Sequence, residues 1–258
     1  MEKQAERIRE QGKRAEAAPP PDPVEKPGSP VVSRPVRSYR GYVFQAYLIG
    51  ATLGFAALFI LARQFAYFGV DLYLARAIQA FHAGWVTFLM EFVSGLGYNP
   101  LSYLFLILIV SLFYVIGLRW ESMMLIFAAI GVSVLGGAIK LIVHRARPTP
   151  DLVNVFLRLS DYSFPSGHVL LFTAFLGFLV FMIFTLAPRS WARTLGLVFL
   201  ALLIALVGIS RVYLGEHWPS DVFGAYLLGS LWLTLTVYVY RWGKPRFFKN
   251  QPLAKEKP

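Results

Sequence analysis

The sequence predicts an all-α membrane protein with six transmembrane helices, and two observations carry this prediction. The 258-residue chain is 57% hydrophobic and only 15% charged, with a mean hydropathy of +0.56. A soluble domain of this size has no core large enough to bury so much apolar surface. The apolar residues are also gathered into runs of roughly 20 residues, the length that crosses a bilayer. The chain contains no cysteine, so disulfides and thiol chemistry are excluded.

Residues 1–40 are polar, first rich in Arg, Lys and Glu and then rich in proline. They lack the apolar stretch that a cleavable signal peptide carries after its basic start. We expect a disordered cytoplasmic tail, either a solvated segment that fixes orientation or an arm that binds a partner or lipid. Residues 41–242 then form one membrane domain, and residues 243–258 form a second basic tail.

Six apolar runs are the expected spans, and short polar connections separate most of them. They are Tyr42–Ala62, Leu101–Leu118, Ser122–Ile139, His168–Ala187, Thr194–Ser210 and Asp221–Tyr240.

Residues 65–98, between the first and second spans, have a different pattern. Asp71, Arg76, Gln79, His82 and Glu91 interrupt their apolar residues. This segment predicts one or two amphipathic helices lying at the membrane interface. A seventh span is the alternative, and the cost of burying its charges weighs against it. His82 and Glu91 are expected to make interfacial contacts rather than to take part in catalysis.

The distribution of charge predicts the orientation. The net charge is +11, and most Lys and Arg residues lie at the chain ends and in short loops, a placement that argues against nucleic-acid binding. Six spans put both termini on one side, together with Arg119 and the Arg189/Arg193 loop. The positive-inside rule assigns that side to the cytoplasm. We therefore expect a multi-pass protein of the plasma (inner) membrane whose third span ends, and fourth span begins, at the outer face.

Three polar segments then fall at that outer face. The first begins with Lys140 at the end of the third span and continues to Arg147-Pro148. Both cations suit phosphate oxygens, and Arg binds them in a fork. A lysine at the end of a span is also a common snorkelling anchor. Arg145, between the two cations, is expected to be a headgroup contact or a loop charge.

The second polar segment is Pro165-Ser166-Gly167-His168, directly before an apolar helix. Ser166 suits an N-cap, and the helix dipole places partial positive charge there. The backbone N–H groups of Ser166, Gly167 and His168 are expected to cradle an anion, with His168 beside it. The alternative is a plain capped helix with an interfacial histidine.

The third polar segment runs from Ser210-Arg211 through His217 to Asp221. Arg211 supplies another cation. His217 and Asp221 are four residues apart, a spacing that puts both on one face of a helix. Asp221 would then accept a hydrogen bond from one ring nitrogen of His217, leaving the other nitrogen free to attack. An ion-paired helix cap is the alternative.

Taken together, the segments resemble the type 2 phosphatidic acid phosphatase superfamily, whose pattern is K-x6-R-P, P-S-G-H and S-R-x5-H-x3-D. The chain matches it at every position, within a resemblance covering roughly residues 65–241. The resemblance implies that His217 is the nucleophile, forming a phosphohistidine, that Asp221 orients it, and that His168 protonates the leaving oxygen. It implies phosphate binding by Lys140, Arg147, Ser166, Gly167 and Arg211, and it implies no metal and no cofactor.

The expected activity is hydrolysis of a lipid phosphate: phosphatidic acid, phosphatidylglycerol phosphate or a polyprenyl diphosphate. One alternative is phosphotransfer to a lipid or sugar acceptor through the same intermediate. Another is a non-catalytic lipid-binding or transport protein that kept the fold. The expected partners are a lipid phosphate and the bilayer, without nucleic acid, and the sequence leaves the oligomeric state open.

Overall fold

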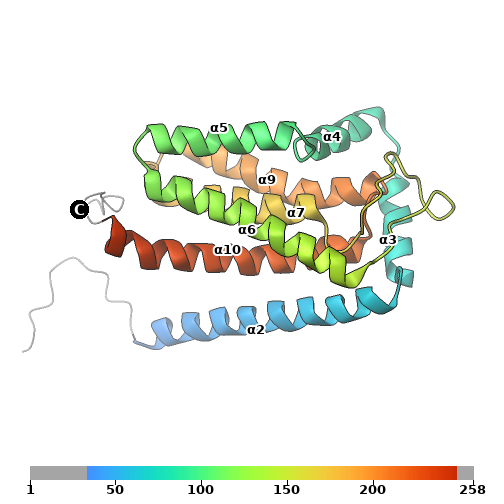
Figure 1. The fold of residues 1–258 in the computed structure, drawn as a ribbon, viewed down its shortest axis with the longest axis horizontal. Helices are drawn as coiled ribbons and strands as arrows, with labels where there is room; N and C mark the ends of the chain where they lie inside the picture. Colours follow the sequence, from blue (N-terminus) through green and yellow to red (C-terminus); the bar gives the residue numbers. More distant parts are fainter. Residues whose placement is uncertain (1–33, 249–258) are drawn as a thin grey trace, which may run out of the picture. The chain divides into compact units, whose positions relative to one another are not determined.

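The computed structural model describes residues 34–248, and every regular element in that range is a helix. Most of the expected N-terminal tail and the last ten residues lie outside the described range. The elements in chain order are α2 (Arg34–Gln64), α3 (Gly69–Gln79), α4 (Gly84–Gly95), α5 (Leu101–Val115), α6 (Arg119–Val143), α7 (Gly167–Leu171), the π-helical η1 (Phe172–Leu176), α8 (Gly177–Leu186), α9 (Trp191–Tyr213) and α10 (Pro219–Phe247) (Figure 1).

The chain divides into two compact units, residues 1–44 and residues 45–258. In the first unit, residues 34–44 are helical and form the beginning of α2. All contacts described below belong to the second unit.

Five of the described helices are long and apolar enough to cross a membrane, with lengths of 20 to 29 residues. The expected second span is shorter, because α5 has only 15 residues and ends at Val115 rather than at Leu118. Gly117 follows with a φ of +87°, a turn conformation that glycine adopts at no steric cost. At 1.5 Å per residue, α5 is about 22 Å long, against roughly 30 Å for the hydrocarbon core.

Residues 65–98 form two short helices, α3 and α4. Two of the polar residues that interrupt this segment are buried, Asp71 with 1% and Gln79 with 5% of their surface exposed. Gln79 donates to the carbonyl oxygens of Asn154 and Tyr213, at 2.7 and 2.8 Å. These residues therefore make tertiary contacts that hold α3 against the ends of other elements.

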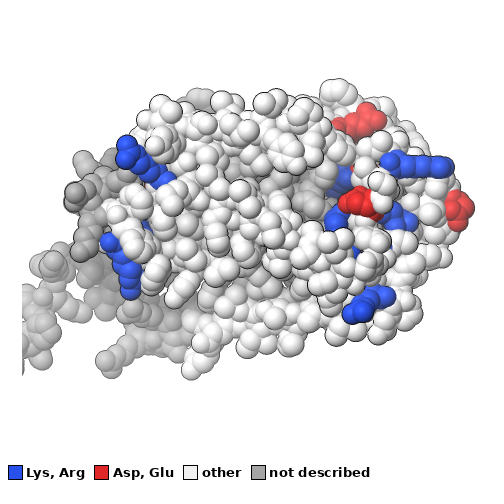
Figure 2. Space-filling model, in the orientation of Figure 1, with Lys and Arg blue, Asp and Glu red and all other residues white. Residues whose placement is uncertain are grey.

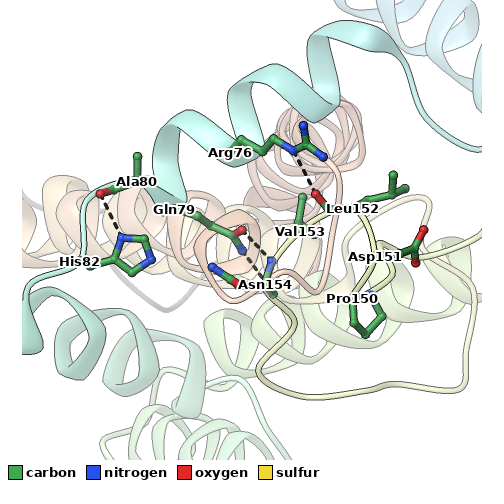
Figure 3. Close-up of a pocket in the computed structure, with 9 residues that line it drawn as sticks. All are labelled: Arg76, Gln79, Ala80, His82, Pro150, Asp151, Leu152, Val153 and Asn154. Carbon is green, nitrogen blue, oxygen red and sulfur yellow. Dashed lines mark hydrogen bonds between the residues drawn. The ribbon is translucent and has the colours of Figure 1, made fainter.

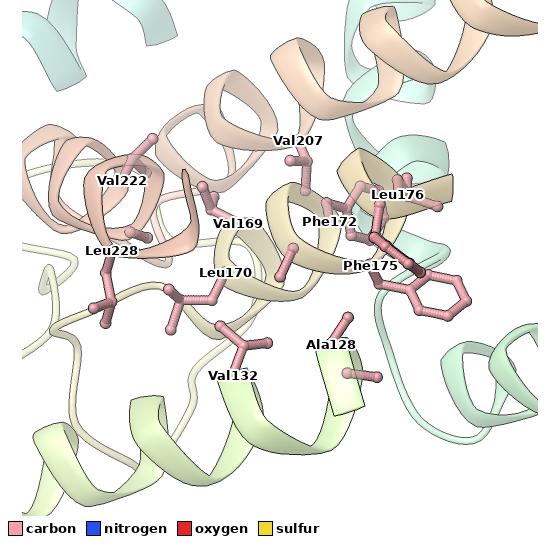
Figure 4. Packing of buried hydrophobic residues seen from close by; sticks show 14 of the residues in the cluster. Ala128, Val132, Val169, Leu170, Phe172, Phe175, Leu176, Val207, Val222 and Leu228 are labelled. Atoms are coloured by element: carbon pink, nitrogen blue, oxygen red, sulfur yellow. The ribbon is translucent and has the colours of Figure 1, made fainter. Parts of the chain in front are cut away.

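The helix that begins at Gly167 lies in the middle of the second unit. Its first parts, α7 and η1, contact α6, α9 and α10. Figure 4 shows the buried side chains that meet there, among them Ala128, Val132, Val169, Leu170, Phe172, Phe175, Leu176, Val207, Val222 and Leu228. The π turn interrupts what the sequence predicted as a regular span, and such turns are frequent at functional sites. This packing fixes the direction of the helix whose N-terminus carries His168.

Charged side chains on the visible face gather toward the ends of the helices, and the middle is uncharged (Figure 2). A buried ion pair joins Glu121, at the start of α6, to Lys244, near the end of α10. α10 itself runs to Phe247, past residue 242, where the sequence placed the end of the membrane domain. The motif residues lie at the opposite ends of these two helices.

Candidate active site

The three polar segments converge at one end of the helices, where the 144–166 connection, α3 and the turn between α9 and α10 meet (Figure 1). Close packing of this turn requires glycine at position 215. Its φ is +68°, and a Cβ there would overlap the backbone of Asn154. The N–H of Phe156 donates to the carbonyl oxygen of Leu214 at 3.0 Å. These contacts fix the turn that carries His217 against the connection that carries Arg147.

His217 is buried, with 2% of its surface exposed, and precedes α10 rather than lying on it. The predicted direct hydrogen bond to Asp221 is absent, because Nδ1 lies 3.7 Å from Oδ2. The Ser163 hydroxyl contacts both groups instead, donating to Asp221 Oδ2 at 2.5 Å and lying 3.4 Å from His217 Nδ1. Asp221 also accepts the N–H of Trp218 at 2.9 Å, which ties it to the helix start. Asp221 therefore faces the imidazole, and Ser163 contacts both groups. The sequence did not reveal this role of Ser163.

The other ring nitrogen of His217, Nε2, lies 3.2 Å from Nη1 of Arg147. A guanidinium has only donors, so Nε2 accepts, and the ring proton lies on Nδ1, toward Asp221. Burial lowers the pKa of His217 well below its ordinary value, and Arg147, Arg211 and Lys140 lower it further. The imidazole is therefore neutral at pH 7, with its Nε2 lone pair directed toward cations.

Arg145 is not the headgroup contact or loop charge that the sequence suggested. It is buried and pairs with Asp221 at 2.5 Å and with Asp71 at 2.9 Å. Asp71 also accepts from the N–H and hydroxyl of Ser220, at 2.9 and 2.7 Å. Removing Arg145 or one of its two carboxylate partners would leave an uncompensated buried charge, which would lower the free energy of unfolding by roughly 3–5 kcal/mol. Arg145 thus links α3 to the carboxylate that faces His217.

Arg211, which the resemblance implies to be a phosphate-binding cation, already has several partners in the structure. Its guanidinium is fully buried and pairs with Glu216, the residue before His217. It also donates to Ser94 Oγ and to the hydroxyl of Tyr98, which in turn donates to Glu216. Glu216 is its ion-pair partner, and one donor of Arg211, Nε, remains buried without a hydrogen-bond partner among the described residues.

The segment at the start of α7 provides fewer free backbone donors than predicted. Ser166 occupies the N-cap position, but its side chain makes no capping bond. Its N–H donates to the carbonyl oxygen of Asp221 at 3.4 Å. The N–H groups of Gly167 and His168, in the first turn, are left for an anion.

The ring of His168 packs edge-on against Tyr98, with centroids 4.9 Å apart. Gly97 makes this position accessible, because a Cβ at residue 97 would overlap the imidazole. Tyr98 therefore contacts His168 with its ring and the Arg211–Glu216 pair with its hydroxyl. Neither Gly97 nor Tyr98 belongs to the sequence motifs.

Three motif residues carry buried polar atoms that have no hydrogen-bond partner within residues 34–248: Ser166 Oγ, His168 Nε2 and Arg211 Nε. Buried polar atoms are ordinarily paired, so each such atom needs an explanation. Two of these atoms belong to the second polar segment and one to the third, which fits a polar ligand held between the two segments.

Lys140 and Arg147 both contact Asp161, a residue that the sequence did not single out. Burial tends to raise the pKa of Asp161, but hydrogen bonds and charge from Lys140 and Arg147 outweigh it and lower the pKa to about 2. Asp161 is therefore ionised at any working pH.

A pocket of about 280 Å³ opens beside this site, between α3 and residues 150–154. Figure 3 shows Arg76 and Gln79 of α3 hydrogen-bonded to this loop, and none of the motif residues lines the pocket. Among residues 34–248, no group of three or more His, Asp and Glu side chains is placed to hold a metal ion.

Residues 121–245 match the sequence model of the PAP2 superfamily, and this range contains all three polar segments. Residues 121–245 are a PAP2 superfamily segment. An undecaprenyl-diphosphatase of Sulfolobus acidocaldarius is 36% identical over 104 residues, which cover 39% of this chain and 46% of that protein. Phosphatidylglycerophosphatase B of Bacillus subtilis is 25% identical over 160 residues, covering 61% of this chain and 77% of that protein.

The fold of this chain also occurs in a solved structure. A transmembrane PAP2-type phosphatidylglycerolphosphate phosphatase from Bacillus subtilis superimposes with a TM-score of 0.64 at 22% identity, covering 77% of this chain and 99% of that one. Together with the five apolar helices, these similarities establish a multi-pass membrane protein whose relatives include lipid phosphatases.

Proposed function

We propose that this protein is a phosphatase that hydrolyses a lipid phosphate monoester or diphosphate through a phosphohistidine. The observation that carries the proposal is the environment of His217. Its Nε2 lone pair points to the Arg147 guanidinium, where phosphoryl oxygens would bind, and its opposite nitrogen faces Asp221. A buried, neutral imidazole oriented in this way is an activated nucleophile.

In the first step, His217 Nε2 attacks phosphorus, a P–N bond forms, and the P–O bond to the lipid breaks. The departing oxygen takes a proton from His168. Asp221 stabilises the positive charge that develops on His217. In the second step, water attacks phosphorus, the P–N bond breaks, and His168 takes the proton from the water. Lys140, Arg147 and the N–H groups at the start of α7 bind the phosphoryl oxygens in both transition states.

Substrate choice lies between the lipid classes of the relatives. Undecaprenyl diphosphate is the substrate named for one relative, and phosphatidylglycerol phosphate is named for another. We include phosphatidic acid because the residues assigned to binding would hold the phosphoryl group, which all three lipids share.

The test is phosphate release by the purified full chain from phosphatidic acid, phosphatidylglycerol phosphate and a polyprenyl diphosphate, each with and without EDTA. We expect turnover of at least one lipid, unchanged by EDTA, because fixed cations rather than a metal ion hold the phosphate. Loss of activity on chelation with recovery on adding magnesium would contradict the mechanism. Absence of phosphate release from all three lipids would contradict the function.

We further propose six spans, with α5 as a short second span, α3 and α4 at the interface, both termini cytoplasmic and the site outside. Cysteine labelling tests this orientation, because the native chain has no cysteine. Ser160→Cys and Ala192→Cys place thiols at exposed positions at opposite ends of the helices. An impermeant thiol reagent applied to intact cells should label only Ser160→Cys. The reverse pattern would invert the topology.

A further inference from the structure

The two cations of the first polar segment share one carboxylate. Asp161 Oδ2 lies 2.5 Å from Lys140 Nζ, and Asp161 Oδ1 lies 2.7 Å from Arg147 Nη2. Each oxygen takes one cation, as two oxygens of a phosphoryl group would. The Asp161 side chain is 56% exposed, whereas those of Lys140 and Arg147 are 16% and 11% exposed. An exposed acidic side chain thus covers cations that are themselves largely enclosed.

Arg147 has no donor to spare in this arrangement. A guanidinium offers five N–H donors. All five have acceptors in the structure, which are Asp161 O, Asp161 Oδ1, Tyr162 O, Glu216 O and His217 Nε2. A phosphate oxygen can bind Arg147 only by replacing one of these acceptors.

The Asp161 carboxylate is the acceptor most easily replaced. The other acceptors are three backbone carbonyls and one buried ring nitrogen. The backbone next to Asp161 is held in place, because the N–H of Ser163 donates to Arg145 O at 2.9 Å. Turning the carboxylate outward requires a rotamer change in one exposed side chain, whereas moving a carbonyl requires the connection itself to shift.

We propose that Asp161 is an internal competitor for the phosphate site, holding Lys140 and Arg147 when the site is empty and being displaced when a phosphoryl group binds. The inference rests on the proposed phosphatase function. Affinity for any phosphate is then reduced by the fraction of molecules in which Asp161 occupies the cations. A lipid substrate is also held by its hydrocarbon chain, but the inorganic phosphate product is not. Return of Asp161 therefore favours release of the product.

The experiment compares Asp161→Asn with the wild-type chain and uses inorganic phosphate as the probe. Asparagine keeps the size of the side chain and removes its charge. An ion pair with one exposed partner contributes roughly 0.2–1 kcal/mol, so phosphate should bind about 1.4- to fivefold more tightly to the variant. This should appear as a lower inhibition constant for phosphate and an equally lowered KM for p-nitrophenyl phosphate, without a rise in kcat. Asp151→Asn is the matched control, because Asp151 is an exposed acid of the same connection with no ion pair in the structure, and it should change neither value.

A second measurement does not depend on turnover, namely the rise in thermal stability of each protein with added phosphate. Unchanged or weaker phosphate binding by Asp161→Asn would overturn the inference, and weaker binding would show that the carboxylate positions the cations instead. If the wild type hydrolyses lipid phosphate while the variants bind alike, only this inference fails. If the wild type neither binds phosphate nor releases it from lipids, the proposed function fails as well.

Discussion

His217→Gln should abolish turnover on every substrate, lipid or soluble. The imidazole is needed twice, first to attack phosphorus and then to carry the phosphoryl group until water arrives. A carboxamide of similar size provides no comparable nucleophile. When several catalytic residues act as a unit, removal of the nucleophile lowers kcat by about 10⁴- to 10⁶-fold. Phosphate release from p-nitrophenyl phosphate and from the best lipid substrate measures the loss.

His82→Ala is the matched control for this experiment. His82 is exposed, hydrogen-bonds only to the nearby carbonyl oxygen of Ala80, and was predicted from the sequence to have no catalytic role. Its variant should keep wild-type activity. The variant of His217 should still gain thermal stability with phosphate, because Lys140 and Arg147 remain. Substantial activity in His217→Gln, on either substrate, would remove His217 from the role of nucleophile.

The sequence predicted where the motif residues meet because polar residues are rare in this chain and lie at the ends of apolar runs. Since a span has two ends, counting spans placed Lys140, His168 and Asp221 together without any knowledge of the packing. α5 departs from that simple rule: it is apolar along its whole length but stops after 15 residues, where Gly117 allows a turn. Hydropathy indicates that a segment is apolar and does not indicate where its helix ends.

The partners of the motif residues were not predictable in the same way. Arg145 resembled a loop charge, because the neighbouring sequence does not indicate that Asp71 is its partner. Asp71 lies 74 residues earlier in the chain, and its Oδ2 is only 2.9 Å from Arg145 Nη2. A weak signal existed, since an acidic residue in an apolar segment requires a partner. Asp161 and Tyr98 gave no such signal, because a polar residue in a connection between spans is usually only solvated. Their contacts depend on how the 144–166 connection and the end of α4 pack, which spacing does not encode.

His168→Ala should lose activity selectively, according to the leaving group. Protonation of a departing alkoxide by a positioned acid contributes about 10²- to 10⁴-fold in rate. A lipid alkoxide needs this help, whereas p-nitrophenolate departs largely unprotonated. We therefore expect kcat/KM, which reports formation of the phosphohistidine, to fall about 10²- to 10⁴-fold on phosphatidic acid and far less on p-nitrophenyl phosphate in His168→Ala. Hydrolysis of the phosphohistidine also uses His168, so kcat should fall on both substrates. The ratio of the two losses in kcat/KM within one protein excludes a general folding defect as the cause.

Gly97→Ala tests the same role without touching the histidine. A methyl group at residue 97 would overlap the His168 ring and displace it, and a misplacement of about 1 Å can cost roughly 10²-fold. The loss in kcat/KM should again be larger on phosphatidic acid than on p-nitrophenyl phosphate. Gly95→Ala is the matched control, since a Cβ at residue 95 meets nothing within 4 Å, and it should leave both rates unchanged. Equal losses in kcat/KM on the two substrates in both His168→Ala and Gly97→Ala would show that His168 does not act as the acid for the leaving oxygen.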